Sequence, residues 1–80
     1  MADTRNLILA MEECGELIRA CSKILRHGTK NPKYLHNLVE EIGDVRAIME
    51  LILSEHNIPE NEIQFYIQQR LKKMRSPTYE

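Results

Sequence analysis

The first third of the chain carries apolar residues at steps of three and four, which is the period of an amphipathic helix. Gly28 supplies a stop for this helix, and Arg26 and His27 lie in its last turn, where positive charge suits the helix dipole. The apolar stripe predicted to face a helical bundle comprises Leu7, Met11, Cys14, Ile18, Cys21 and Leu25, widened by Ile8, Leu17 and Ile24.

A second helix is predicted from about Pro32 to Glu55. Asn31 is a favourable N-cap, and Pro32 fits the first helical turn because its missing N–H needs no partner there. Only a few residues separate the two helices, so they are expected to lie antiparallel as a hairpin. The predicted buried face of the second helix comprises Leu35, Leu38, Val39, Ile42, Val45, Met49, Ile52 and Leu53.

The segment "EHNIPEN" interrupts this pattern, and Pro59 opens a third predicted helix with Glu60 and Glu62 in its first turn. Residues 76–80 are expected to fray. With no β pattern or internal repeat, the sequence predicts an all-α fold of three helices in one domain, residues 1–80. The third helix has a weaker apolar stripe, which comprises Ile63, Tyr66, Ile67, Leu71 and Met74.

Length and composition bear on how such helices are stabilised. The chain has 80 residues, 42% hydrophobic and 29% charged, which is typical of a globular protein rather than a disordered one. A core of this size supplies little stability alone. We therefore expect the hairpin and third helix to complete a four-helix-type bundle by oligomerisation, as a homodimer or homotetramer.

Charge and cysteine content narrow the function classes. A net charge of −1 gives no general attraction to nucleic acid or to an acidic membrane surface. No apolar run has membrane-spanning length and the N-terminus lacks the layout of a signal peptide, so a reducing cytoplasm is expected. Cys14 and Cys21 are seven apart, a spacing that favours core packing over a metal or redox site.

Two carboxylate pairs interrupt the apolar pattern. Glu13 and Glu16 are three apart on the first helix, and Glu41 and Asp44 repeat that spacing on the second. An antiparallel hairpin brings the mid-points of the two helices together, so the four carboxylates could converge on one rim of the groove. Oxygen ligands of this kind suit Mg²⁺ or Mn²⁺, and the absence of Glu-x-x-His argues against a di-iron site.

The alternative for these acids is a solvated helix face, with Glu12 and Glu40 paired to lysines and arginines. Spacing alone does not decide between this alternative and a metal site. A cation would offset the repulsion of like charges beside an apolar surface.

The segments "EECGEL" and "LVEEIGDV" resemble the paired metal-binding motifs of the MazG-like, all-α nucleoside triphosphate pyrophosphohydrolases, and "CSKILRHG" is similar to the segment after the first motif. The resemblance covers residues 7–56. It implies hydrolysis of a nucleoside or deoxynucleoside triphosphate to monophosphate and pyrophosphate. It also implies that Glu13, Glu16, Glu41 and Asp44 bind Mg²⁺, with Mn²⁺ able to substitute. Glu13 or Glu12 could accept the proton of the attacking water.

Basic residues could meet the phosphates of such a substrate. Lys23 and Arg26 follow the first motif on the same helix, and Lys72 and Lys73 lie in the basic tail of the chain. The chain departs from the family in being short, so any further helix that completes the pocket would come from another subunit. Arg46 stands where such proteins tend to be apolar.

Other functions remain open from the sequence. Tyr34, Phe65 and Tyr66 could stack on a base, although aromatic residues at helical spacing more often pack in a core. The runner-up function is a non-catalytic oligomerisation or adaptor module that binds a protein partner. A small nucleic-acid binder is a weaker alternative, because the overall charge is slightly acidic.

Overall fold

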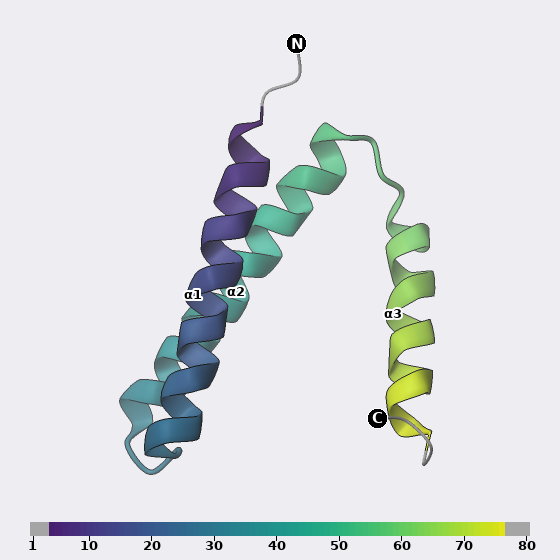
Figure 1. Ribbon diagram of the computed structural model, residues 1–80. Helices are drawn as coiled ribbons and strands as arrows, with labels where there is room; N and C mark the ends of the chain where they lie inside the picture. Colours follow the sequence, from purple (N-terminus) through teal and green to yellow (C-terminus); the bar gives the residue numbers. More distant parts are fainter. Residues whose placement is uncertain (1–3, 77–80) are drawn as a thin grey trace.

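The computed structural model describes residues 4–76, which form three helices and no strand (Figure 1). Helix α1 spans Arg5–His27, α2 spans Pro32–Glu55 and α3 spans Glu60–Arg75. The predicted all-α fold and the antiparallel hairpin of the first two helices are confirmed. None of the three helices is both long and apolar enough to cross a membrane.

The turn between α1 and α2 is built from the residues that the sequence indicated. Gly28 follows the last helical residue with φ 76° and ψ −170°, a backbone conformation essentially restricted to glycine, and its N–H donates to the carbonyl of Ile24 at 2.7 Å. Three residues later Asn31 Oδ1 accepts the N–H of Lys33 at 3.0 Å, ahead of Pro32 at the first helical position. These two caps fix where the helices end and begin.

Helix α3 stands apart from the hairpin (Figure 1). Nearly all the packing between helices is that of α1 against α2. The N-cap of α3 is Pro59, its first turn holds Glu60 and Glu62, and its last turn is basic. Ser76 ends it, with its N–H donating to the carbonyl of Lys73 at 3.2 Å. The fraying expected for residues 76–80 otherwise lies outside the described residues.

Within the hairpin, the residues that pack between α1 and α2 are buried or half-buried, and we call them the inner stripe. Ala20 and Ile48, 1% and 5% exposed, are the most deeply buried of the described residues. The inner stripe comprises Ala10, Glu13, Leu17, Ala20 and Ile24 of α1 and Tyr34, Leu38, Glu41, Val45, Ile48 and Ile52 of α2.

The predicted apolar stripes are partly wrong as an account of this packing. Leu17 and Ile24 of α1 and Leu38, Val45 and Ile52 of α2 do lie in the inner stripe, but most of the other predicted residues lie one position after it. Most of them are exposed instead: Ile18 is 69% and Leu25 87% exposed. Cys21 is exposed and Cys14 only half-buried, so the predicted core position of Cys21 is also wrong. We call the exposed set the outer apolar face; it comprises Leu7, Met11, Ile18 and Leu25 of α1 and Leu35, Val39, Ile42 and Met49 of α2.

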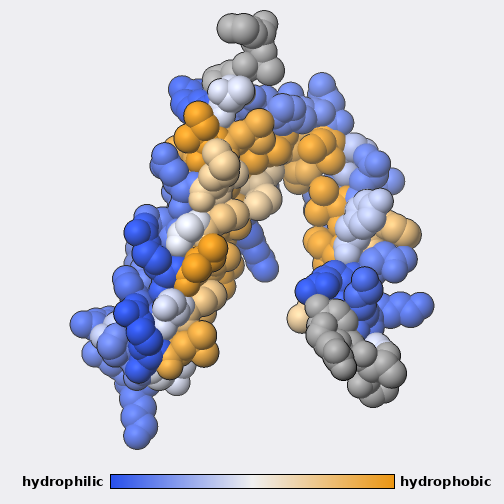
Figure 2. All heavy atoms as spheres, in the orientation of Figure 1, coloured by the Kyte–Doolittle hydropathy of each residue, from blue (hydrophilic) through white to orange (hydrophobic). Residues whose placement is uncertain are grey.

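Because the two helices run antiparallel, equivalent positions of both helices project to the same side of the hairpin. A residue one position after the inner stripe projects to the same side of the hairpin from either helix, and a residue one position before it projects to the opposite side. Figure 2 shows apolar side chains along the hairpin on the side toward α3 and polar ones on the other side. We call that other side the polar side; it comprises Glu12, Glu16, Arg19 and Lys23 of α1 and Lys33, Asn37, Glu40 and Asp44 of α2.

Candidate metal centre

Three of the four predicted metal ligands meet at the middle of the hairpin. Glu13, Glu41 and Asp44 each offer a carboxylate oxygen, and these oxygens all lie within 4.8 Å of one another. Glu13 and Glu41 belong to the inner stripe and are half-buried, whereas Asp44 is exposed on the polar side. The cluster therefore lies partly between the helices and is open to solvent on one side.

Glu41 is the electrostatic centre of this cluster. Its Oε2 is shielded from solvent and has no hydrogen-bond partner, the one such side-chain atom among the described residues. Burial raises the pKa of Glu41 above its ordinary value, and the charges of Asp44, Glu16, Glu13 and Glu40 raise it further, in that order. A lone pair that is desolvated, unpartnered and surrounded by negative charge is a site that a hard cation would stabilise.

The fourth predicted ligand points elsewhere. Glu16 Oε1 accepts a hydrogen bond from Arg19 one turn later on α1, and it is outside the group of three carboxylates. Its charge still reaches Glu41, so it lies close to the cluster. Rotation of one side chain would be needed to make it a ligand, and that rotation competes with the ion pair.

Glu12, the other predicted proton acceptor besides Glu13, is exposed on the polar side. It lines a shallow depression of about 450 Å³ together with Met11, Gly15, Glu16 and Arg19. It thus lies beside the carboxylate cluster but does not belong to it.

The structure also has features of the alternative, a solvated and ion-paired helix face: Asp44 is exposed, and Glu16 is paired with Arg19. Glu40 contacts His36 Nε2 at 3.3 Å, a partner that is charged only when protonated, rather than a lysine or arginine. The recorded pairing of Glu16 with Arg19 leaves the three clustered acids without a basic partner within the described ion pairs.

The predicted phosphate-binding residues fall into two groups. Lys23 and Arg26 lie at the turn end of the hairpin, where they line a pocket of about 390 Å³ with His27, Lys33, Tyr34 and Asn37. Lys72 and Lys73 lie in the last turn of α3, which stands apart from the hairpin, so the structure does not bring them to the acids within one chain (Figure 1).

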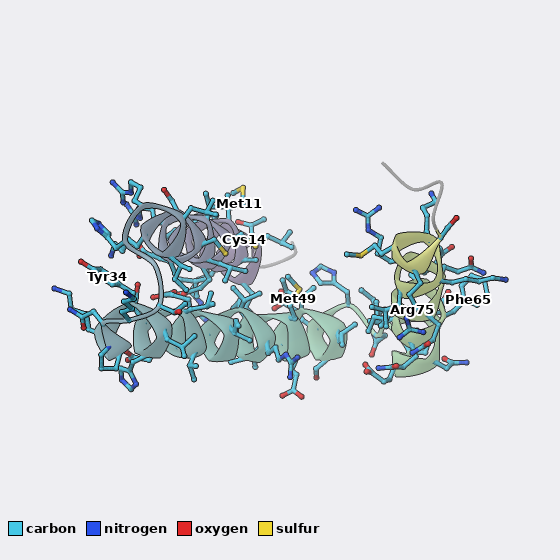
Figure 3. The ribbon with its side chains drawn as sticks, turned by 90° about the horizontal axis from the view of Figure 1, so that it is seen from below. Met11, Cys14, Tyr34, Met49, Phe65 and Arg75 are labelled. Carbon is cyan, nitrogen blue, oxygen red and sulfur yellow. The ribbon has the colours of Figure 1, made fainter. Side chains whose placement is uncertain are left out.

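The turn pocket as a unit was not predicted from the sequence. A signal for it does exist: residues 17–39 contain no aspartate or glutamate but five lysines and arginines. Figure 3 places Tyr34 at the turn end of the hairpin, whereas Phe65 lies on the side of α3 that faces away from the hairpin. Of the aromatic residues considered as base-stacking candidates, Tyr34 is the one that lines a pocket with Lys23 and Arg26.

Comparison with known proteins adds no relative to this geometry. No protein-family model matches the chain, and neither a curated protein nor a solved structure matches it at a significant level. The resemblance to MazG-like proteins rests on the motif residues, three of which form the cluster at the centre of the hairpin.

Proposed function

We propose that the protein is a Mg²⁺-dependent pyrophosphohydrolase that converts a nucleoside or deoxynucleoside triphosphate to the monophosphate and pyrophosphate. The observation that supports this function best is the meeting of Glu13, Glu41 and Asp44 around the shielded, unpartnered Oε2 of Glu41. The donor set is all oxygen and opens to the polar side, as a cation that also holds phosphate oxygens requires.

The residues fit this cation, and the role of each follows from its place. Glu13 and Glu41 would hold it from between the helices and Asp44 from the rim, with Glu16 as a further ligand once released from Arg19. When bound, Mg²⁺ or Mn²⁺ supplies charge neutralisation of the phosphates and a water of lowered pKa.

Proton transfer needs a carboxylate that is near the cluster. Glu12 is exposed on the polar side beside the cluster and would accept the proton of a water attacking the α-phosphorus, with Glu13 as the alternative acceptor.

We propose further that the active form is a homodimer or homotetramer in which hairpins pack through their outer apolar faces. In the single chain Val39 is 60% and Ile18 69% exposed, and both belong to the outer apolar face. Packing there would complete a four-helix bundle and leave the carboxylate cluster open. It could also bring Lys72 and Lys73 of a second copy toward the phosphates.

The first experiment is turnover of each ribo- and deoxyribonucleoside triphosphate with Mg²⁺, Mn²⁺ or EDTA, with products resolved by anion-exchange chromatography. Metal-dependent release of monophosphate and pyrophosphate is expected. Glu41→Gln should abolish turnover, whereas Glu50→Gln, an exposed change on the same helix, should leave it unchanged.

The exposed apolar surfaces of the hairpin and α3 favour a second candidate, an oligomerisation or adaptor module that binds a protein partner. If neither the wild-type protein nor Glu41→Gln turns over any nucleotide with either metal, this alternative is selected.

A further inference from the structure

The pocket at the turn end of the hairpin has a chemistry distinct from that of the carboxylate cluster. It is lined by three cations, Lys23, Arg26 and Lys33, with the amide of Asn37 beside them. The rings of His27 and Tyr34 stack there, with centroids 4.7 Å apart and planes inclined by 12°. These two rings join the end of α1 to the start of α2 and form a wall that is already in place without a ligand.

The pocket side chains are held near one another by local contacts. Arg26 Nε donates to the carbonyl of Ser22 at 3.4 Å, and Lys33 Nζ lies 5.1 Å from the centroid of the Tyr34 ring. Ammonium, guanidinium, amide and phenol groups all offer N–H or O–H donors. The lining therefore presents many donors and no carboxylate acceptor.

Charge is strongly segregated along the chain, and the pocket lies where the positive charge is concentrated. Residues 17–39 carry five lysines and arginines and no acid, a formal charge of +5. Since the whole chain has a charge of −1, the other 57 residues carry −6. The turn end of an overall acidic protein is thus a strongly basic site, which attracts multiply charged anions.

The pocket and the carboxylate cluster open on the same side of the hairpin. Lys23 follows Glu16, which lies beside the cluster, by seven residues on α1, and Asn37 precedes Asp44 of the cluster by seven residues on α2. Seven residues are two helical turns, about 10 Å along the axis. All four residues belong to the polar side, so the acids and the basic pocket form a line along it.

We propose that the turn pocket binds a diphosphate anion, and that it does so without a divalent metal. The donors of Lys23, Arg26 and Lys33 would neutralise the oxygens, with the stacked rings of Tyr34 and His27 as one wall. The anion is either free pyrophosphate or the β,γ end of a bound triphosphate. In the second case, which rests on the proposed hydrolase function, the α-phosphate lies at the acids and the nucleoside toward the open end of the hairpin.

Titration of the protein with inorganic pyrophosphate in EDTA, followed by calorimetry, tests the site apart from any turnover. We expect saturable binding that weakens with salt, and a loss of about fivefold or more in affinity for each of Lys33→Gln and Arg26→Gln. Arg46→Gln, which removes the same charge from the exposed surface of α2 outside the pocket, should bind as the wild type does. Circular dichroism would check that the variants keep their helices, as expected for exposed side chains.

Two further measurements identify the source of the diphosphate. If the pocket receives the β,γ end of the substrate, pyrophosphate will inhibit hydrolysis competitively and Lys33→Gln will raise KM more than it lowers kcat. If the pocket is a separate pyrophosphate site, KM will not change although binding in EDTA is weakened. If the protein binds pyrophosphate but hydrolyses no triphosphate, this site is supported and the proposed function is rejected.

The proposal is overturned if wild-type protein does not bind pyrophosphate in EDTA, or if the two turn variants bind it as well as Arg46→Gln does. Binding of a single-stranded oligonucleotide that is weakened by Lys33→Gln but is not displaced by pyrophosphate would also overturn it, in favour of a nucleic-acid surface.

Discussion

Glu41 links the stability of the protein to its proposed chemistry. Its carboxylate is held between the helices and near four other acids, with Oε2 shielded and without a hydrogen-bond donor. Such a group destabilises the metal-free fold when it is ionised. A bound cation would remove that penalty, so a residue unfavourable for folding can be favourable for binding.

The first prediction concerns the pH dependence of the metal-free protein. The pKa of Glu41 is raised above its ordinary value of 4.5, so the folded state holds this proton more tightly than the unfolded chain. Its stabilising contribution is therefore present below about pH 4.5 and is lost as the pH rises through the raised pKa. In EDTA, Glu41→Gln should exceed wild type in Tm by an amount that grows from pH 4.5 to pH 8.

Glu50→Gln is the control for this series, because Glu50 is exposed on α2 and its replacement removes the same charge. Its Tm difference from wild type should stay nearly constant over the same pH range. A Glu41→Gln protein that is less stable than wild type at every pH would contradict the assignment and make Glu41 a structural residue.

The ion pair between Glu16 and Arg19 gives a second prediction at this scale. Arg19→Gln would release the Glu16 carboxylate to join the three clustered acids. Exposed pairs of this kind contribute about 0.2–1 kcal/mol, so Mg²⁺ should bind more tightly, by up to about fivefold. Isothermal titration of Mg²⁺ measures this directly.

Lys30→Gln removes an equal charge from the exposed turn and should change Mg²⁺ affinity less than Arg19→Gln does. Equal affinities for the Arg19 and Lys30 variants would show that Glu16 does not join the site when its partner is removed.

At the scale of elements, the helix boundaries could be predicted because each depends on a few adjacent residues. The Asn31 cap with Pro32 and the Gly28 stop lie where local backbone chemistry puts them. The face that packs could not be predicted in the same way. Each hairpin helix carries two neighbouring apolar stripes, and periodicity alone does not tell which one contacts the partner helix.

The same difference between local residue chemistry and the packing of whole helices explains which parts of the candidate site could be predicted. Glu13, Glu41 and Asp44 could be expected to meet because the short turn fixes the register of the two helices. The place of Lys72 and Lys73 depends on how α3 sits relative to the hairpin, which no local pattern determines. The turn pocket depends on charge summed over 23 residues, whereas motif reading considers a few at a time.

The prediction at the scale of elements concerns the stability of the fold when Gly28 is replaced. Its φ of 76° with ψ of −170° belongs to a region that residues with a Cβ rarely adopt, although a Cβ there would meet no neighbouring atom. Gly28→Ala should therefore destabilise the fold by backbone strain alone, by about 1–3 kcal/mol in urea unfolding. Gly43→Ala, within α2, should be neutral or stabilising, since its Cβ would also meet open space.

At the scale of the whole molecule, one chain exposes far more surface than its mass requires. The accessible surface is 6786 Å², whereas a compact monomer of 9.4 kDa has about 5,000 Å². The radius of gyration is 15.5 Å against about 12 Å for a compact chain of this length. An excess of this size in each of two chains falls in the range that obligate homodimers bury.

The outer apolar face is the part of this surface that self-association would cover, and one helix offers a matched test of it. Val39 and Leu51 are both exposed apolar residues of α2, 60% and 54%, but Val39 belongs to the outer apolar face and Leu51 projects to the opposite side of the hairpin. Val39→Glu would place a charge within the proposed hairpin-to-hairpin contact, where its desolvation opposes assembly.

We expect Val39→Glu to sediment as a monomer at concentrations where wild type and Leu51→Glu sediment as a dimer or tetramer. If the carboxylate cluster is complete within one hairpin, the monomeric variant will still bind Mg²⁺, because Glu13, Glu41 and Asp44 come from one chain. If residues from a second copy hold the phosphates, the same variant will lose triphosphate turnover. Assembly of Val39→Glu that matches wild type would instead place the contact between copies on α3 or on the polar side.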